Sequence, residues 1–80
     1  MNDNINHPKH YADEKAPCEC IDVIKYITNK CNDGFEAYCI GNVIKYLWRA
    51  GIKADNVCED YGKARWYLDY VCNRYRNERP

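Results

Sequence analysis

The chain of 80 residues contains no serine, which excludes a serine nucleophile. It has no excess of one charge, because twelve Lys and Arg balance twelve Asp and Glu. A neutral chain lacks the electrostatic footprint of a general nucleic-acid binder, although a local basic patch stays open. It also lacks the G-x-x-x-x-G-K-[ST] phosphate loop, the standard route to ATP. We therefore expect no general nucleic-acid binding and no conventional ATP site.

Long apolar runs are also missing. No run reaches the about 20 residues needed to span a bilayer, and residues 1–11 lack the apolar core of a signal peptide. We expect a cytoplasmic protein without membrane contact. In that reducing compartment cysteines are predicted to be small buried hydrophobic residues, whereas a secreted chain would favour three disulfides. The six cysteines are Cys18, Cys20, Cys31, Cys39, Cys58 and Cys72.

Hydrophobic periodicity predicts an all-α fold, a small three-helix domain with an extended N-terminal arm. The helices are expected at about residues 19–30, 35–50 and 57–75. The sequence "NDG" at 32–34 is expected to end the first helix, and Gly51 to cap the second in a left-handed conformation. Asn56 and Glu59 are spaced as a capping box for the third. The predicted divisions are an arm at 1–17, a helical domain at 18–76 and a frayed tail at 77–80.

Apolar residues recurring at intervals of three and four predict the buried side of each helix. In the first helix they are Cys20, Ile24, Ile27 and Cys31. In the second they are Phe35, Cys39, Val43, Tyr46 or Leu47, and Ala50. In the third they are Val57, Tyr61, Ala64, Leu68, Val71 and Tyr75, a seam like that of a coiled coil.

Aromatic residues are abundant for so small a domain, with eight tyrosines and two tryptophans. A chain of this size has a marginal core and cannot bury all of that surface. Part of it is expected to face a ligand or a second copy of the chain. We therefore predict a homo-oligomer, which would also supply the extra stability that small domains need.

The segment "NHPKHY" places two histidines close to Cys18-x-Cys20, and both residue types bind zinc. Two thiolates at C-x-C spacing are awkwardly close for one tetrahedral ion. Pro8 prevents the helical geometry that would aim His7 and His10 at one point. We expect neither a metal nor another cofactor. The segment is interpreted as a grip on an anion, with a strap packed over the core as the alternative.

Three polar residues of the second helix, Asn42, Lys45 and Arg49, share one face because they are spaced by three and four. Lysine offers phosphate a point charge and arginine adds bidentate hydrogen bonds. Basic residues late in a helix also commonly complement its dipole, so this reading has an alternative. The acidic residues Glu59, Asp60 and Asp69, which could act as acid or base, are expected to form a solvated face.

Four segments resemble one phage family: "NHPKHY", "CIDVIKY", "GFEAYCIGNVIKYLWRAGIK" and "EDYGKARWYLD". It is the phage domain-of-unknown-function family of SaV-like proteins, which includes a nucleotide kinase of T7-like phages. The resemblance covers about residues 5–71. It implies a small helical phage protein that handles nucleotides or interferes with host defence. The matching positions are His7, Pro8, His10 and Tyr11, then Asn42, Lys45, Tyr46, Trp48 and Arg49, then Lys63, Trp66 and Tyr67.

The leading hypothesis is a phage accessory protein that binds a nucleotide or cyclic nucleotide through its phosphates. Acting by binding rather than turnover, it would sequester a nucleotide immune signal of the host. The alternatives are a deoxynucleoside monophosphate kinase without the usual phosphate loop, and a protein–protein inhibitor of a host defence factor. The predicted phosphate ligands are His7, Lys9, His10, Asn42, Lys45 and Arg49. The candidates for stacking on the base are Tyr11, Trp48 and Trp66.

Overall fold

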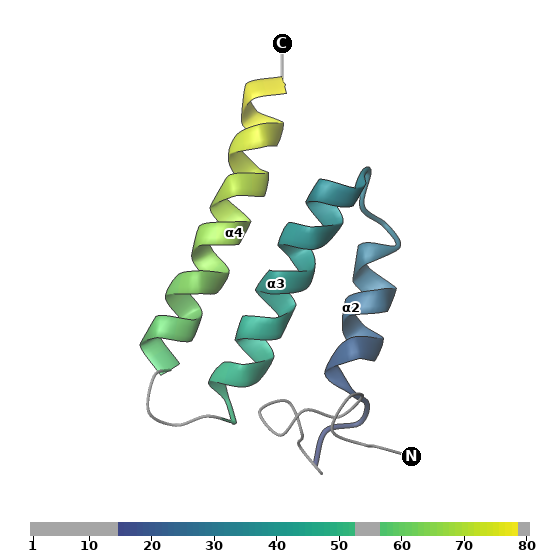
Figure 1. Cartoon of the computed structure of the whole chain (residues 1–80), viewed down its shortest axis with the longest axis vertical. Helices are drawn as coiled ribbons and strands as arrows, with labels where there is room; N and C mark the ends of the chain where they lie inside the picture. The colour runs from purple at the N-terminus through teal and green to yellow at the C-terminus, as the bar shows by residue number, and fades with distance from the viewer. Residues whose placement is uncertain (1–14, 53–56, 79–80) are drawn as a thin grey trace.

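The fold is a single layer of helices. The computed structural model describes residues 15–52 and 57–78. This part of the chain forms three helices and no strand: α2 (Cys20–Thr28), α3 (Gly34–Ala50) and α4 (Val57–Glu78). They lie side by side with α3 in the middle, antiparallel to both of its neighbours (Figure 1). The all-α, three-helix prediction is confirmed.

The first two helices begin at side-chain caps. A capping box joins Glu19 and Asp22 at the start of α2, where the Glu19 N–H donates to the Asp22 carboxylate at 3.1 Å. At the start of α3 the Asp33 carboxylate accepts the Glu36 N–H at 2.9 Å. The prediction that "NDG" ends the first helix is wrong, because α2 already ends at Thr28. Asp33 instead begins the next helix, the role in which its side chain is most favourable.

Gly51 is the C-cap of α3 as predicted, but its predicted left-handed conformation is wrong. Gly51 has a right-handed conformation, with φ −82° and ψ −12°. The Ile52 N–H donates to the Arg49 carbonyl at 3.0 Å, so the chain leaves α3 through a tight right-handed turn. The predicted cap at Asn56 lies outside the described residues. Helix α4 continues to Glu78, three residues beyond the expected Tyr75.

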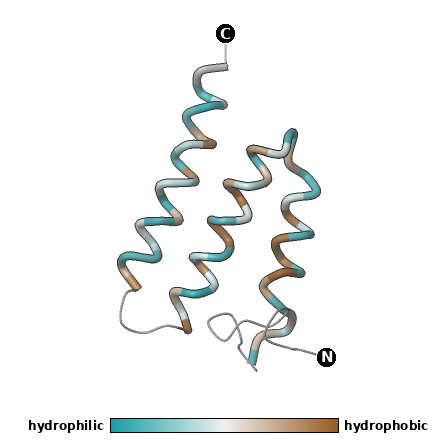
Figure 2. Tube along the Cα trace, viewed as in Figure 1, coloured by the Kyte–Doolittle hydropathy of each residue, from teal (hydrophilic) through white to brown (hydrophobic). Residues whose placement is uncertain are grey.

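The core is small and made of small side chains. Its buried apolar residues are Cys20, Cys39, Val43, Ala50, Ala64 and Val71. The predicted apolar stripes are wrong at four positions, because Phe35, Tyr61, Leu68 and Tyr75 are exposed. Of the two alternatives Tyr46 and Leu47, Tyr46 is partly covered and Leu47 is exposed. The reason is the single layer: among the described helices α4 packs mainly against α3, so the innermost positions of its seam are the ones that are buried. Figure 2 shows that α4 is largely hydrophilic, with the apolar residues concentrated on α2 and α3.

The cysteines are free thiols, but the prediction that they are buried holds for only two of them. Cys20 and Cys39 lie in the core and Cys31 is partly covered. The exposed cysteines are Cys18, Cys58 and Cys72.

Candidate anion-binding site

Six aromatic side chains of α3 and α4 form a continuous network along one side of this helix pair. Neighbouring ring centroids are 5.0–6.2 Å apart, a favourable range for aromatic pairs. In order of contact the rings are Phe35, Tyr70, Trp66 and Tyr67, with Tyr38 and Tyr46 both against Tyr67. We call these six residues the aromatic strip. Four of them are half exposed or more, and Trp66 reaches 61%.

Two lysines lie at one end of the aromatic strip. The Lys45 Nζ is 5.3 Å from the centroid of the Tyr46 ring, and the Lys63 Nζ is 5.4 Å from the same centroid. The lysines come from different helices, so the antiparallel packing of α3 and α4 brings them together. A cation within about 6 Å of an aromatic ring is attracted to its face. This arrangement holds two positive charges beside an exposed aromatic surface.

Arg49 extends this cationic end, and the structure shows that its side chain is held by a buried acid. The Arg49 Nε lies 3.4 Å from the Asp60 Oδ2, and the two side chains are 22% and 1% exposed. The expectation that Asp60 belongs to a solvated face is therefore wrong. Glu59 and Asp69 do lie on the surface, in ion pairs with Lys63 and Arg65. We call Lys45, Arg49 and Lys63 the cationic end.

The remaining predicted site residues divide into three groups. Asn42 lies on the strip side of α3, where its amide donates to the Tyr38 carbonyl at 2.9 Å. Trp48 lies elsewhere: it is seven residues after Gly41, whose backbone faces Ile24 of α2, so Trp48 shares the side of α3 towards α2. The predicted residues outside the described part of the chain are His7, Lys9, His10 and Tyr11.

The ionisable groups near the core do not resemble an activated nucleophile or a metal centre. Burial raises the pKa of the Cys20, Cys31 and Cys39 thiols, which keeps them protonated and weakly nucleophilic. A hydrogen bond with Tyr38, and then burial, raises the pKa of Tyr67. Within residues 15–52 and 57–78, no three His, Cys, Asp or Glu side chains gather as metal ligands would.

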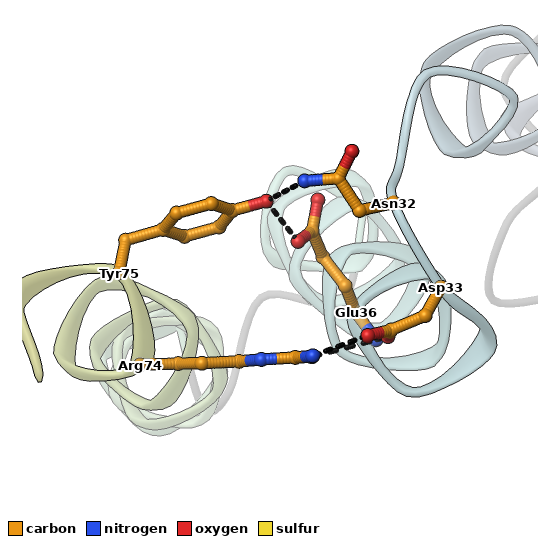
Figure 3. Close-up of polar contacts among 5 residues, drawn as sticks. All are labelled: Asn32, Asp33, Glu36, Arg74 and Tyr75. Carbon is orange, nitrogen blue, oxygen red and sulfur yellow. Dashed lines mark hydrogen bonds and ion pairs between the residues drawn. The ribbon is translucent and has the colours of Figure 1, made fainter. Parts of the chain in front are cut away.

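A second polar cluster lies at the opposite end of the α3–α4 pair (Figure 3). The Tyr75 hydroxyl donates to the buried Glu36 carboxylate and accepts from the Asn32 amide. Arg74 donates to both oxygens of Asp33, one of them at 3.1 Å. These contacts tie the loop between α2 and α3 to α4. All five side chains have partners within the cluster, so we assign it a structural role.

The Asp33–Arg74 pair perturbs the titration of its carboxyl group. The hydrogen bonds from Arg74, together with the Glu36 backbone N–H, lower the pKa of Asp33 to about 2. At Tyr75 the hydrogen bond to Glu36 is the largest cause of a raised pKa. Both shifts favour the protonation states that hold the loop in place at neutral pH.

The outer side of α2 carries an open depression of about 400 Å³. Its lining residues are Cys18, Asp22, Val23, Tyr26, Ile27 and Lys30. Its surface is almost entirely apolar, and none of its lining residues belongs to the aromatic strip or the cationic end. None of the described helices is both long enough and apolar enough to cross a membrane.

Comparison with known proteins gives the family. Residues 5–69 match the family described as protein of unknown function DUF3310. The chain belongs to this family. It is also 30% identical over 69 residues to the gene 1.7 protein of Enterobacteria phage T3, covering 82% of this chain and 40% of that protein. This DUF3310 chain thus spans less than half the length of that curated relative. No solved structure matches it.

These matches confirm the predicted resemblance to a phage family of unknown function, and they fit a phage accessory protein. Sequence reasoning missed two buried acids, Asp60 and Glu36. A signal for both was present, because Asp60 precedes the buried Ala64 by four residues and Glu36 precedes the buried Val43 by seven. An acidic residue on the same helix face as buried apolar residues is expected to lie in the interior and to have a polar or charged partner there.

Proposed function

We propose that this DUF3310 chain binds a nucleotide, with the phosphates at the cationic end and the base on the aromatic strip. The observation that supports this most directly is the pair of lysines on one tyrosine ring, Lys45 and Lys63 on Tyr46, beside the exposed Trp66. Lysine attracts phosphate as a point charge, and an exposed indole offers a face on which any base stacks. The family membership supports a phage accessory protein.

The roles of the individual residues follow from their contacts. Lys45 and Lys63 bind phosphate oxygens, and their positive charge is local in a chain with no net charge. Arg49 contributes charge from a side chain whose Nε faces Asp60. Trp66 is the stacking surface, while Asn42 on the same side of α3 offers an amide. The predicted arm residues His7, Lys9, His10 and Tyr11 remain part of the proposal and are tested by truncation.

The biological role that we propose is sequestration of a nucleotide signal of host defence in the cytoplasm of the infected bacterium. Support comes from the phage family and from a site composed of binding groups. A kinase acting on deoxynucleoside monophosphates is the enzymatic alternative. Inhibition of a host protein is a further candidate, favoured by the exposed Trp66, Tyr38 and Tyr70, because aromatic residues are enriched in interface hot spots.

Calorimetry with a panel of mono-, di- and cyclic nucleotides tests the binding directly. We expect Lys45→Ala to weaken binding by roughly 1.5–3 kcal/mol, the range for hydrogen bonds to charged groups. Added salt should weaken binding as well, since the attraction is screened. The matched control is Lys30→Ala, because Lys30 also lies over a tyrosine ring, 4.7 Å from the Tyr26 centroid, but on α2.

Each outcome separates the candidates. Loss of affinity in Lys45→Ala with none in Lys30→Ala supports the site. Equal affinity of Lys45→Ala and Lys30→Ala for the nucleotide contradicts the proposed site. Chromatography of the nucleotide after incubation shows whether it returns unchanged, and a phosphorylated product would favour the kinase. No binding of any nucleotide would leave the protein–protein inhibitor as the better candidate.

A further inference from the structure

The core that the described helices enclose is thin. The radius of gyration is 14.1 Å, whereas a compact chain of 80 residues has about 12 Å. The shortest principal extent is 20 Å, and within residues 15–52 and 57–76 no buried apolar side chain is larger than valine. A layer this thin leaves large apolar groups in water unless something covers them.

One set of exposed apolar residues is continuous with the core. Leu47, Tyr61 and Leu68 are 51%, 52% and 43% exposed. Leu47 lies one turn after the buried Val43, and Tyr61 and Leu68 lie one turn before and after the buried Ala64. These three side chains therefore border the buried seam between α3 and α4. We call Leu47, Tyr61 and Leu68 the apolar margin.

The apolar margin faces away from the proposed nucleotide site. Leu47 follows Lys45 by two positions and Leu68 follows Trp66 by two, which places each pair about 200° apart around its helix. Lys45 and Trp66 belong to the side where rings and lysines of both helices meet. The α3–α4 pair thus has an aromatic and cationic side and an apolar side.

We infer that the apolar margin is the contact surface between two copies of this chain. A second copy presents the same three side chains, and a two-fold axis would set one α3–α4 pair against the other as a four-helix arrangement. The broad dimensions of the molecule, 48 × 28 Å, suffice for the about 800 Å² per partner that a specific interface needs. This inference does not depend on nucleotide binding.

A second copy matches the margin better than the chain's own N-terminal residues do. Residues 1–14 are mostly polar, with Met1, Ile5 and Tyr11 as their large apolar side chains. The margin itself bears no charged side chain, and the nearest ion pair on α4, Arg65 with Asp69, is between highly exposed groups. An uncharged apolar surface beside a thin core is typical of a homodimer contact.

Light scattering coupled to gel filtration tests this on the full chain. We expect the wild-type mass at micromolar concentration to be at least twice the 9.5 kDa of one chain. Leu68→Glu should weaken self-association at least 100-fold and give the monomer mass, because a charge would be buried in the contact. Trp66→Glu is the matched control: it places the same charge on the opposite side of the same helix and should leave the mass unchanged. Circular dichroism shows whether each variant is folded.

The milder Leu68→Ala keeps the test decisive if the glutamate variant does not fold, with an expected loss of about tenfold in association. A monomeric wild-type chain at all concentrations would overturn the inference. So would dissociation by Trp66→Glu in place of Leu68→Glu, which would assign the contact to the aromatic strip. A monomeric full chain that dimerises once residues 1–14 are removed would identify those residues as the occupant.

Discussion

The two buried acids illustrate how single residues fix this small domain. Glu36 accepts a hydrogen bond from Tyr75, whereas Asp60 is 1% exposed and its Oδ2 lies 3.4 Å from the Arg49 Nε. A buried carboxylate is tolerated only with a partner that offsets its lost hydration. Asp60 and Arg49 therefore depend on each other, and they join the last turn of α3 to the first turn of α4.

Replacing Arg49 tests this dependence. Arg49→Ala leaves the Asp60 carboxylate buried without a counter-charge, so we expect the free energy of unfolding to fall by about 3–5 kcal/mol. Lys63→Ala removes an exposed lysine paired with Glu59 and should cost at most about 1 kcal/mol. Urea denaturation followed by circular dichroism measures both. The two variants losing equal stability would contradict the assignment of Asp60 to the interior.

The Asp33–Arg74 pair predicts a pH dependence of stability. The pKa of Asp33 is about 2 in the folded chain and about 3.8 without its partners. A lowered folded-state pKa means that stability is fully present above pH 4–5 and is lost as the pH falls towards 2. We expect Asp33→Asn, which keeps a good N-cap, to flatten this part of the profile. Thermal unfolding at pH 2–6 measures it, and an unchanged slope in the variant would show that other groups cause the loss.

At the scale of the helices, the existence and type of all three elements followed from periodicity. The helix ends were predicted less accurately, since Asp33 begins α3 instead of ending α2, and Gly51 caps α3 in a right-handed conformation instead of a left-handed one. Burial along the helices could be predicted only in part. Ala64 and Val71 are buried as the seam predicts, but Leu68 between them is exposed, because α3 is the main neighbour of α4 among the described helices. The number of neighbours that a helix has is not contained in its own pattern.

Two helical glycines give a prediction about element stability. Gly62 of α4 has open space where a Cβ would be, so Gly62→Ala should stabilise the chain by about 0.8–1 kcal/mol. A Cβ at Gly41 would lie 3.6 Å from the Ile24 side chain, an ordinary contact, so Gly41→Ala should also stabilise. Gly41→Leu, in contrast, should cost about 1–3 kcal/mol by pushing α2 from α3. Thermal unfolding compares the three variants. Destabilisation by Gly41→Ala would show that α2 and α3 approach more closely than this 3.6 Å contact implies.

At the scale of the whole molecule, the two sides of the α3–α4 pair carry different kinds of side chain, aromatic and cationic on one side and apolar on the other. Asn42, Lys45 and Arg49 were predicted on one face from spacing alone, and the structure adds Lys63 and Trp66 from α4 to the same side. The proximity of these α3 and α4 residues could not be predicted from the pattern of either helix, because it depends on the register between the two helices. Trp48 was grouped with these residues by its family match, yet its register places it towards α2.

The N-terminal arm provides the last test at this scale. Removing residues 1–11 takes away His7, Lys9, His10 and Tyr11 but none of the buried apolar residues of the described helices. We therefore expect the truncated chain to keep its helical circular dichroism and its oligomeric state in solution. Nucleotide affinity should fall by at least tenfold, since each lost hydrogen bond to a phosphate contributes roughly 1.5–3 kcal/mol. Calorimetry on the full and truncated chains at equal salt concentration gives the comparison. A truncated chain that unfolds would show that the arm is a structural strap, and one that binds with full affinity would confine the site to α3 and α4.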